Sequence, residues 1–79
     1  MKLTVKYYGM VAEITNKDFE DIVLDNNEGV FKLKDILQKK YKKLSLVNYK
    51  IAVNKKLEEL DIALNEDAEV ALLPPFAGG

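Results

Sequence analysis

The sequence predicts an α+β domain, in which one main helix packs across a mixed sheet of about five strands. Apolar and polar residues alternate with period two near both ends of the chain, and between these stretches the apolar residues recur at helical spacing. With 79 residues, the chain is too short for a second domain or a doubly wound sheet. Residues 1–79 are therefore expected to form one domain, with residues 74–79 as a protruding tail.

The first two strands are expected to form a hairpin. Residues 3–8 alternate and end at Gly9, which predicts a strand. Residues 10–16 form a connector with room for one helical turn, and residues 18–24 form the second strand. The polar run 25–29 then breaks the chain. The side chains expected on the inner face of the first strand are Leu3, Val5 and Tyr7.

The central segment is predicted to be an amphipathic helix over residues 31–43. Its apolar residues lie at positions i, i+3, i+4, i+8 and i+11, which places them in one stripe. Asp35 stands four residues before Lys39, the favourable order for an ion pair along a helix. Lysines cover the other faces, so the stripe is expected to face the sheet. The stripe consists of Leu33, Ile36, Leu37, Tyr41 and Leu44.

The last third of the chain returns to strands. Residues 49–54 alternate and turn at 54–56, a short edge segment follows around 57–60, and the polar turn 65–67 leads into the strand 68–73. Glu69 is expected to face water, which sets the two faces of the last strand. The side chains expected to point inward are Ile51, Val53, Val70 and Leu72, and those expected to point outward are Ala71 and Leu73.

The absence of two residue types restricts the chemistry. The sequence contains no Cys and no His, so it lacks a thiol nucleophile, a thiolate ligand, and the commonest general base and metal ligand. A domain this small also needs most of its apolar residues for its core. We therefore expect that this chain does not act as an enzyme on its own. We also expect no metal site, because the six acids between residues 58 and 69 lack the spacing and the Gly of a calcium loop.

Charge is small overall but unevenly distributed. Twelve Lys and thirteen acids give a net charge of −1, so no strong field would recruit nucleic acid or an anionic membrane. Residues 1–56 carry all twelve Lys and seven acids (+5), whereas residues 57–79 carry six acids and no base (−6), which favours a basic partner for the C-terminal part. The lack of a long apolar run and of a signal-peptide core favours a cytoplasmic location.

The C-terminal tail is the remaining candidate for function. Pro74 and Pro75 cannot continue a central strand and stiffen its exit. The apolar Phe76 follows, and the tail ends at Gly78 and Gly79, which have no Cβ to obstruct a narrow tunnel. For an arbitrary protein, a frayed terminus would be the preferred interpretation. Here the stiff and apolar residues directly after a strand favour presentation of the terminal carboxylate.

These residues resemble the family of molybdopterin synthase small subunits, which are ubiquitin-like sulfur carriers of the MoaD/ThiS type. The likeness includes the tail 74–79, the residues 65–73 before it, the opening strand Val5–Gly9 and the strand Ile51–Asn54. It covers nearly the whole chain. A Gly-Gly end is shared by all such carriers, whereas the Pro-Pro pair before it is more specific.

The resemblance implies a ubiquitin-like β-grasp fold and a carrier role within an enzyme complex. An adenylating, E1-like enzyme would activate the Gly79 carboxylate with ATP, and a sulfur donor enzyme would convert it to a thiocarboxylate. The tail would then enter the large subunit of molybdopterin synthase, in a heterotetramer, and pass its sulfur to cyclic pyranopterin monophosphate to form the dithiolene. The resemblance implies no permanently bound cofactor and no catalysis by the carrier alone.

The resemblance also implies roles for single residues. Gly79 would carry the sulfur, and Gly78 and Ala77 would let the tail pass through a tunnel. Pro74 and Pro75 would aim the tail. The side chains expected to contact the partner are Phe76, Pro75, Pro74, Leu73, Tyr8 and Met10, with Val11 as an alternative to Met10; the competing interpretation of Tyr8 and Met10 is that they complete the core.

Three alternatives remain open at this point. A sulfur carrier for thiazole (thiamine) synthesis is disfavoured by the Pro-Pro pair, which that tail usually lacks. A ubiquitin-like protein modifier would form covalent lysine conjugates. A plain β-grasp binding module would bind its partner equally well without Gly78 and Gly79.

Overall fold

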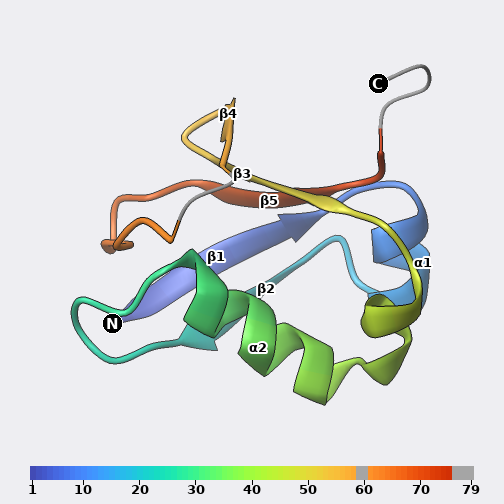
Figure 1. The fold of residues 1–79 in the computed structure, drawn as a ribbon, viewed down its shortest axis with the longest axis horizontal. Helices are drawn as coiled ribbons and strands as arrows, with labels where there is room; N and C mark the ends of the chain where they lie inside the picture. Colours follow the sequence, from blue (N-terminus) through green and yellow to red (C-terminus); the bar gives the residue numbers. More distant parts are fainter. Residues whose placement is uncertain (59–60, 76–79) are drawn as a thin grey trace.

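The computed structural model describes residues 1–58 and 61–75 of the chain (Figure 1). No helix among these residues has the length and apolar character that crossing a membrane requires. The elements, in chain order, are β1 (Lys2–Tyr7), α1 (Met10–Thr15), β2 (Phe19–Val23), α2 (Val30–Lys40), the 3-10 helix η1 (Lys42–Leu46), β3 (Lys50–Val53), β4 (Lys56–Leu57) and β5 (Val70–Leu73).

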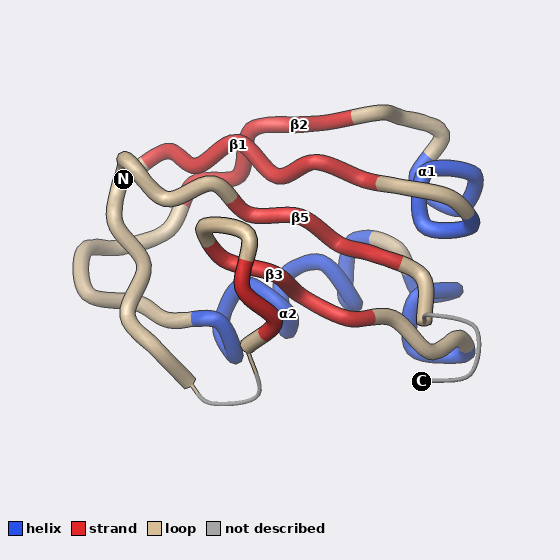
Figure 2. The backbone as a smooth tube through the Cα atoms, turned by 90° about the horizontal axis from the view of Figure 1, so that it is seen from above, coloured by secondary structure: helices blue, strands red, loops and turns tan. Residues whose placement is uncertain are grey.

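The five strands form one mixed sheet in the order β2-β1-β5-β3-β4 (Figure 2). β1 and β2 make the predicted antiparallel hairpin, and β3 and β4 make a second one. β5 lies between them, parallel to β1 and antiparallel to β3. Two hairpins joined by a central last strand, with a helix across one face, give the predicted α+β class and the ubiquitin-like β-grasp fold.

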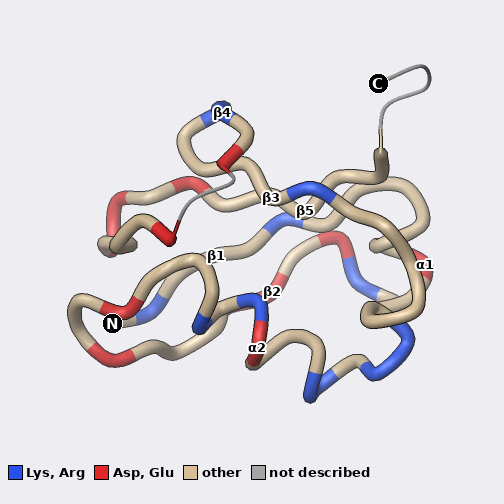
Figure 3. Tube along the Cα trace, viewed as in Figure 1, with Lys and Arg blue, Asp and Glu red and all other residues tan. Residues whose placement is uncertain are grey.

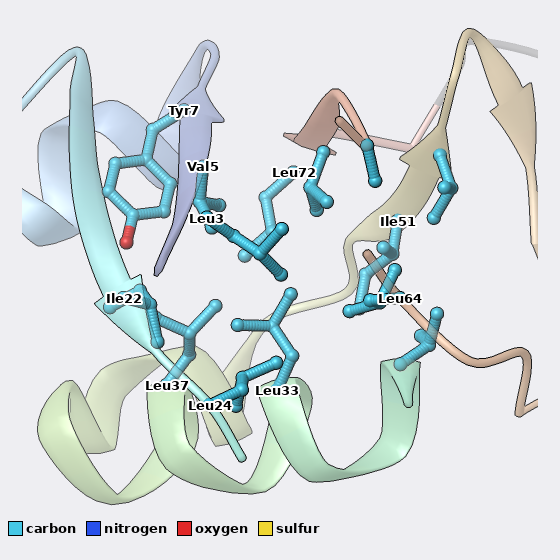
Figure 4. Close-up of a cluster of buried hydrophobic side chains, with 14 of the residues drawn as sticks. Leu3, Val5, Tyr7, Ile22, Leu24, Leu33, Leu37, Ile51, Leu64 and Leu72 are labelled. Carbon is cyan, nitrogen blue, oxygen red and sulfur yellow. The ribbon is translucent and has the colours of Figure 1, made fainter. Parts of the chain in front are cut away.

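The core lies between the sheet and α2 (Figure 4). All seven side chains predicted to point inward from the strands are buried, as are Leu33 and Leu37 of the helical stripe. Burying one such side chain contributes roughly 1.5–3 kcal/mol. Ile36 and Tyr41, also in the stripe, are partly buried and pack against the same cluster. α2 thus covers one face of the sheet, and the opposite face is not covered by this helix (Figure 1).

The prediction that the helix continues to residue 43 is wrong. α2 ends at Lys40, and the backbone of Tyr41 (φ −123°, ψ 89°) leaves the helical conformation. Lys39, Lys40, Lys42 and Lys43 would repel one another on a continued helix, which weakens it at this point. The chain instead forms η1, which buries Leu44 completely in the core.

Polar contacts support both the middle and the start of α2. The predicted ion pair is confirmed, with Lys39 Nζ 3.1 Å from Asp35 Oδ2. At the start of the helix, the Phe31 N–H donates to Asp61 Oδ1 at 3.1 Å and the Val30 N–H donates to the Ile62 carbonyl oxygen at 3.0 Å. The segment after β4 therefore caps a helix that lies about thirty positions earlier in the sequence.

Replacing the capping carboxylate is expected to weaken this end of the molecule. Asp61→Ala should lower the free energy of unfolding by about 1 kcal/mol, because the Phe31 N–H loses its acceptor and the helix N-terminus loses a negative charge. Asp67→Ala is the matched control, since the Asp67 side chain is exposed in the turn before β5. Urea unfolding of both variants measures the difference, and equal stabilities would contradict the capping role.

Candidate functional site

The candidate site is the edge of the sheet at which β5 releases the tail. β1 and β5 are parallel and pair Tyr7 with Leu72, so both strands end at the same edge. The Tyr8 N–H extends this pairing by donating to the Leu72 carbonyl oxygen at 3.1 Å. β5 stops at Leu73, directly before Pro74, because a proline cannot donate to the ladder of a central strand.

Four residues with predicted roles lie outside the described part of the chain. They are Phe76, Ala77, Gly78 and Gly79. Their roles as anchor, tunnel residues and sulfur carrier therefore stay predictions.

The other predicted docking residues gather at the same edge. Tyr8 follows β1 with 45% of its surface exposed, and Met10 begins α1 with 40% exposed, so neither completes the core. Leu73 is half-buried on the outer face, Pro74 is half-buried and Pro75 is exposed. The alternative choice of Val11 is wrong, because α1 turns this side chain fully into the core.

An apolar groove of about 320 Å³ lies on the outer face of the sheet and brings two of these residues together. Its floor includes two small side chains that pair in the sheet, Ala71 of β5 and Ala52 of β3, and Ala52 also pairs with the larger Leu57 of β4. Tyr8 and Leu73 lie at the edge where the tail leaves, whereas Met10 does not line the groove. The complete lining is Tyr8, Ala52, Lys55, Leu57, Glu69, Ala71 and Leu73.

Two residues of opposite charge, Lys55 and Glu69, line the groove beside the turn that joins β3 to β4. Asn54 and Lys55 have positive φ angles of 52° and 69°, which give the tight turn between the two strands. The Asn54 N–H donates to the Glu69 carbonyl oxygen at 2.8 Å, and the Glu69 N–H donates to Asn54 Oδ1 at 3.0 Å. These bonds hold the backbone of Glu69 against the turn, so the groove has an acid and a base beside an apolar floor.

The predicted separation of charge is visible in space (Figure 3). Lysines follow α2 and η1, and two more lie at the turn between β3 and β4, whereas the acids Asp61, Glu66, Asp67 and Glu69 lie in the segment that leads into β5. Within residues 1–58 and 61–75, no three acidic side chains come close enough together to hold a metal ion. Asp61, Glu66, Asp67 and Glu69 are all exposed, and Glu69 also lines the groove.

A second polar cluster lies inside the molecule, around Glu20 of β2. Its carboxylate accepts hydrogen bonds from Tyr7 Oη (2.5 Å), Tyr41 Oη (2.6 Å), Lys40 Nζ (2.7 Å) and Lys17 Nζ (3.1 Å). Only 8% of the residue is exposed. One carboxylate thus joins β1, β2, the end of α2 and the residue before η1.

The charge of Glu20 is set by these partners. Burial alone would raise the pKa of Glu20, but the hydrogen bonds from Lys40, Tyr41, Tyr7 and Lys17 together outweigh it and lower the pKa to about 2. Burial, followed by the hydrogen bond to Glu20, raises the pKa of Tyr7. The carboxylate is therefore ionised and fully paired at neutral pH, which makes the cluster a structural tie between the sheet and α2.

Known proteins resemble this chain over its full length. The profile of the ThiS family matches residues 5–79. A curated relative, the molybdopterin synthase sulfur carrier subunit of Mycobacterium tuberculosis, is 34% identical over 82 aligned positions, which cover 100% of this chain and 99% of the relative.

Two solved structures extend the comparison. A protein from Pyrococcus furiosus, described as a molybdopterin converting factor subunit 1, superposes with a TM-score of 0.89 at 24% identity, covering 96% of this chain and 99% of the other, and thus supports the fold. A complex of subunits 1 and 2 of the molybdopterin-converting factor from Helicobacter pylori contains a chain with a TM-score of 0.70 and 29% identity, with full coverage of both chains. The family match, the full-length relative and the shared architecture lead to one conclusion: the chain belongs to the ThiS family.

Proposed function

We propose that this chain is the sulfur carrier subunit of a molybdopterin synthase. The observation that carries the proposal is the end-to-end match to a curated sulfur carrier subunit of that enzyme. Two features of the chain support it. The central strand β5 leads directly into a Pro-Pro-Phe-Ala-Gly-Gly tail, and an apolar groove lies beside the exit of that tail.

Loading of sulfur takes place at the Gly79 carboxylate. A carboxylate oxygen attacks the α-phosphorus of ATP, so that an acyl-adenylate forms and pyrophosphate leaves. Hydrosulfide from the sulfur donor then attacks the carbonyl carbon, the bond to the phosphate oxygen breaks, and AMP leaves. The product is a thiocarboxylate, and neither step changes the oxidation state of carbon or sulfur. The activating enzyme supplies the catalytic groups for both steps.

Transfer of sulfur takes place in the large subunit. The thiocarboxylate sulfur forms a bond to a carbon of cyclic pyranopterin monophosphate, and the bond from that carbon to oxygen breaks, so that the oxygen leaves with the phosphate group or as water. Water then attacks the carbonyl carbon, the bond between this carbon and sulfur breaks, and the Gly79 carboxylate is regenerated. A second loaded carrier supplies the other sulfur of the dithiolene by the same exchange. The carrier contributes a reactive end and no side-chain catalyst, in agreement with a sequence that contains neither His nor Cys.

The outer-face groove is the docking surface for the large subunit. It lies beside the end of β5, from which the tail starts, so a partner that receives the tail also meets Leu73 and Tyr8. Its apolar floor accepts an apolar side chain, while Lys55 and Glu69 at its rim provide specificity for charged groups.

A charge on the floor of this groove is expected to block docking. Ala71→Asp places a carboxylate where the partner buries apolar surface, so the affinity for the large subunit should fall at least about 100-fold. Val23→Asp is the matched control, because Val23 is 71% exposed on β2, does not line the groove, and should change affinity less than about twofold. Binding is measured by calorimetry with the purified large subunit. Equal affinities of the two variants would contradict the docking surface.

The function is tested by the intact mass of the purified chain after incubation with an adenylating enzyme, ATP and sulfide. We expect the mass increase that corresponds to replacement of one oxygen by sulfur. The loaded chain should then convert the pyranopterin precursor in the presence of the large subunit. Sulfur loading with transfer only to a thiazole precursor would favour a thiamine carrier, and lysine conjugates in cells would favour a modifier. No loading by an enzyme that loads another carrier would overturn the proposal.

A further inference from the structure

Gly9 forms a turn that only glycine adopts without strain. Its backbone angles are φ 58° and ψ −131°, and the Val11 N–H donates to the Tyr8 carbonyl oxygen at 3.2 Å. These are the features of the first central position of a type II′ turn, at which φ is positive. The Gly9 carbonyl oxygen in turn accepts the Glu13 N–H at 3.3 Å, so the same residue starts α1.

Pro74 lies on the face of Gly9 where a side chain would be. A Cβ placed on Gly9 would lie 3.0 Å from Pro74 Cγ and 3.5 Å from Pro74 Cδ. The contact is fixed by the sheet, because the Tyr8 N–H binds the Leu72 carbonyl oxygen and holds the ends of β1 and β5 side by side. The proline ring thus rests on a bare backbone turn at the first residue after β5.

We propose that Gly9 is a positioning residue for sulfur transfer. Because it has no side chain, it leaves room for the Pro74 ring, and the position of this ring sets the direction in which the chain leaves the sheet. The inference rests on the proposed carrier function. The ring of Pro74 fixes its own φ angle, so the position of the ring determines where the following residues start. A side chain at position 9 would push the ring outward by a few tenths of an ångström and strain the turn.

A small tilt at the base of the tail has a large effect at its end. When a partner holds the tail extended, the five residues after Pro74 make a lever of at most about 17 Å. A tilt of roughly 10° then moves the end by about 3 Å. A misplacement of about 1 Å can cost roughly 100-fold in rate. The expected defect therefore lies in the transfer step and not in the affinity of the complex.

The test compares two Gly→Ala variants, one at Gly9 before α1 and one at Gly29 before α2. Gly9→Ala should slow single-turnover sulfur transfer from the loaded carrier at least about tenfold within a saturated complex. Gly29→Ala is the control for lost stability, because its Cβ would meet the Asp61 carboxylate and the Ile62 carbonyl oxygen. Gly29 lies far from the tail in the sequence, and its φ of −116° is not strained for alanine. At a temperature where circular dichroism shows both variants folded, Gly29→Ala should transfer sulfur within about twofold of the wild type.

A second substitution distinguishes the effect of the contact between residue 9 and Pro74 from the effect of general strain in the turn. Pro74→Ala removes the ring atoms that a Cβ on residue 9 would meet. If the contact matters, the effects of Gly9→Ala and Pro74→Ala on the transfer rate are less than additive in the double variant. Strict additivity, or equal slowing by Gly9→Ala and Gly29→Ala, would overturn the positioning role of Gly9 but not the proposed carrier function. A wild-type chain that accepts no sulfur would overturn the carrier function and this inference with it.

Discussion

Deleting Gly79 is expected to abolish sulfur transfer. The shortened chain ends in the carboxylate of Gly78, which would stop one residue, about 3.5 Å, short of both the adenylating site and the precursor. Neither the mass increase with ATP and sulfide nor conversion of the precursor by the large subunit should be detectable. Loading is measured by mass spectrometry, and conversion is measured by the formation of the dithiolene product.

The same deletion should leave folding and docking almost unchanged. Gly79 follows β5 by six positions and lies outside the described residues, and the described sheet, core and groove are formed by other residues. The shortened chain should therefore unfold at the same temperature as the wild type. It should also compete with the loaded wild type for the large subunit. A shortened chain that is fully active, or one that no longer competes, would contradict the division between a docking domain and a reactive tail.

Glu20→Gln is expected to cause a large loss of stability. The amide keeps the shape of the side chain but removes the negative charge that Lys40 and Lys17 pair with, and it cannot accept all four hydrogen bonds. The Lys40 and Lys17 side chains are 46% and 45% exposed and can turn to water, so the cost comes mainly from the lost hydrogen bonds to a buried charged acceptor, each worth about 1.5–3 kcal/mol, and is expected to be about 3 kcal/mol in total. For a domain of this size, a loss of about 3 kcal/mol lowers the melting temperature by roughly 12–24 °C.

Asp21→Asn is the matched control for this substitution. Asp21 neighbours Glu20 on β2 but points to the exposed outer face, where it accepts a hydrogen bond from Thr4 and lies 4.0 Å from Lys2. Exposed pairs contribute less than about 1 kcal/mol. Thermal unfolding of both variants measures the difference, and similar melting temperatures would show that the Glu20 cluster does not stabilise the fold.

Glu20 also predicts how stability depends on pH. Its pKa is about 2 in the folded chain and 4.5 in the unfolded chain, so folding favours the ionised form. This contribution is fully present above pH 4.5 and is lost as the pH falls through about 2. The difference corresponds to about 3 kcal/mol. Urea unfolding between pH 7 and pH 2 should show a smaller acid loss for Glu20→Gln than for the wild type.

The strands and the core could be predicted from the sequence because they depend on local alternation. The period-two pattern places Val5 and Leu72 on inner faces whichever strands are neighbours, and both are buried. The order of the strands is different. The central place of β5 depends on pairing between residues that are more than sixty positions apart, which no local pattern records.

The groove and the Glu20 cluster were missed for related reasons. The groove depends on the register that puts Ala71 opposite Ala52, and the only sequence signal was a pair of small residues at outward positions of two strands. Glu20 shares its inner face with Ile22, so the alternation of β2 could have indicated a buried acid. Its partner Tyr41 could not be identified, because Tyr41 reaches Glu20 only after α2 has ended early.

The central place of β5 has a consequence for the biosynthesis of the protein. The ribosome makes β5 after the other four strands, yet β5 is the strand that joins the two hairpins. While residues 70–73 are still inside the ribosome, β1 and β3 have no common partner and the sheet cannot close. Closure of the sheet and placement of Pro74 beside Gly9 are therefore one event. An activating enzyme that recognises this edge of the sheet would bind only chains in which β5 has already paired with β1 and β3.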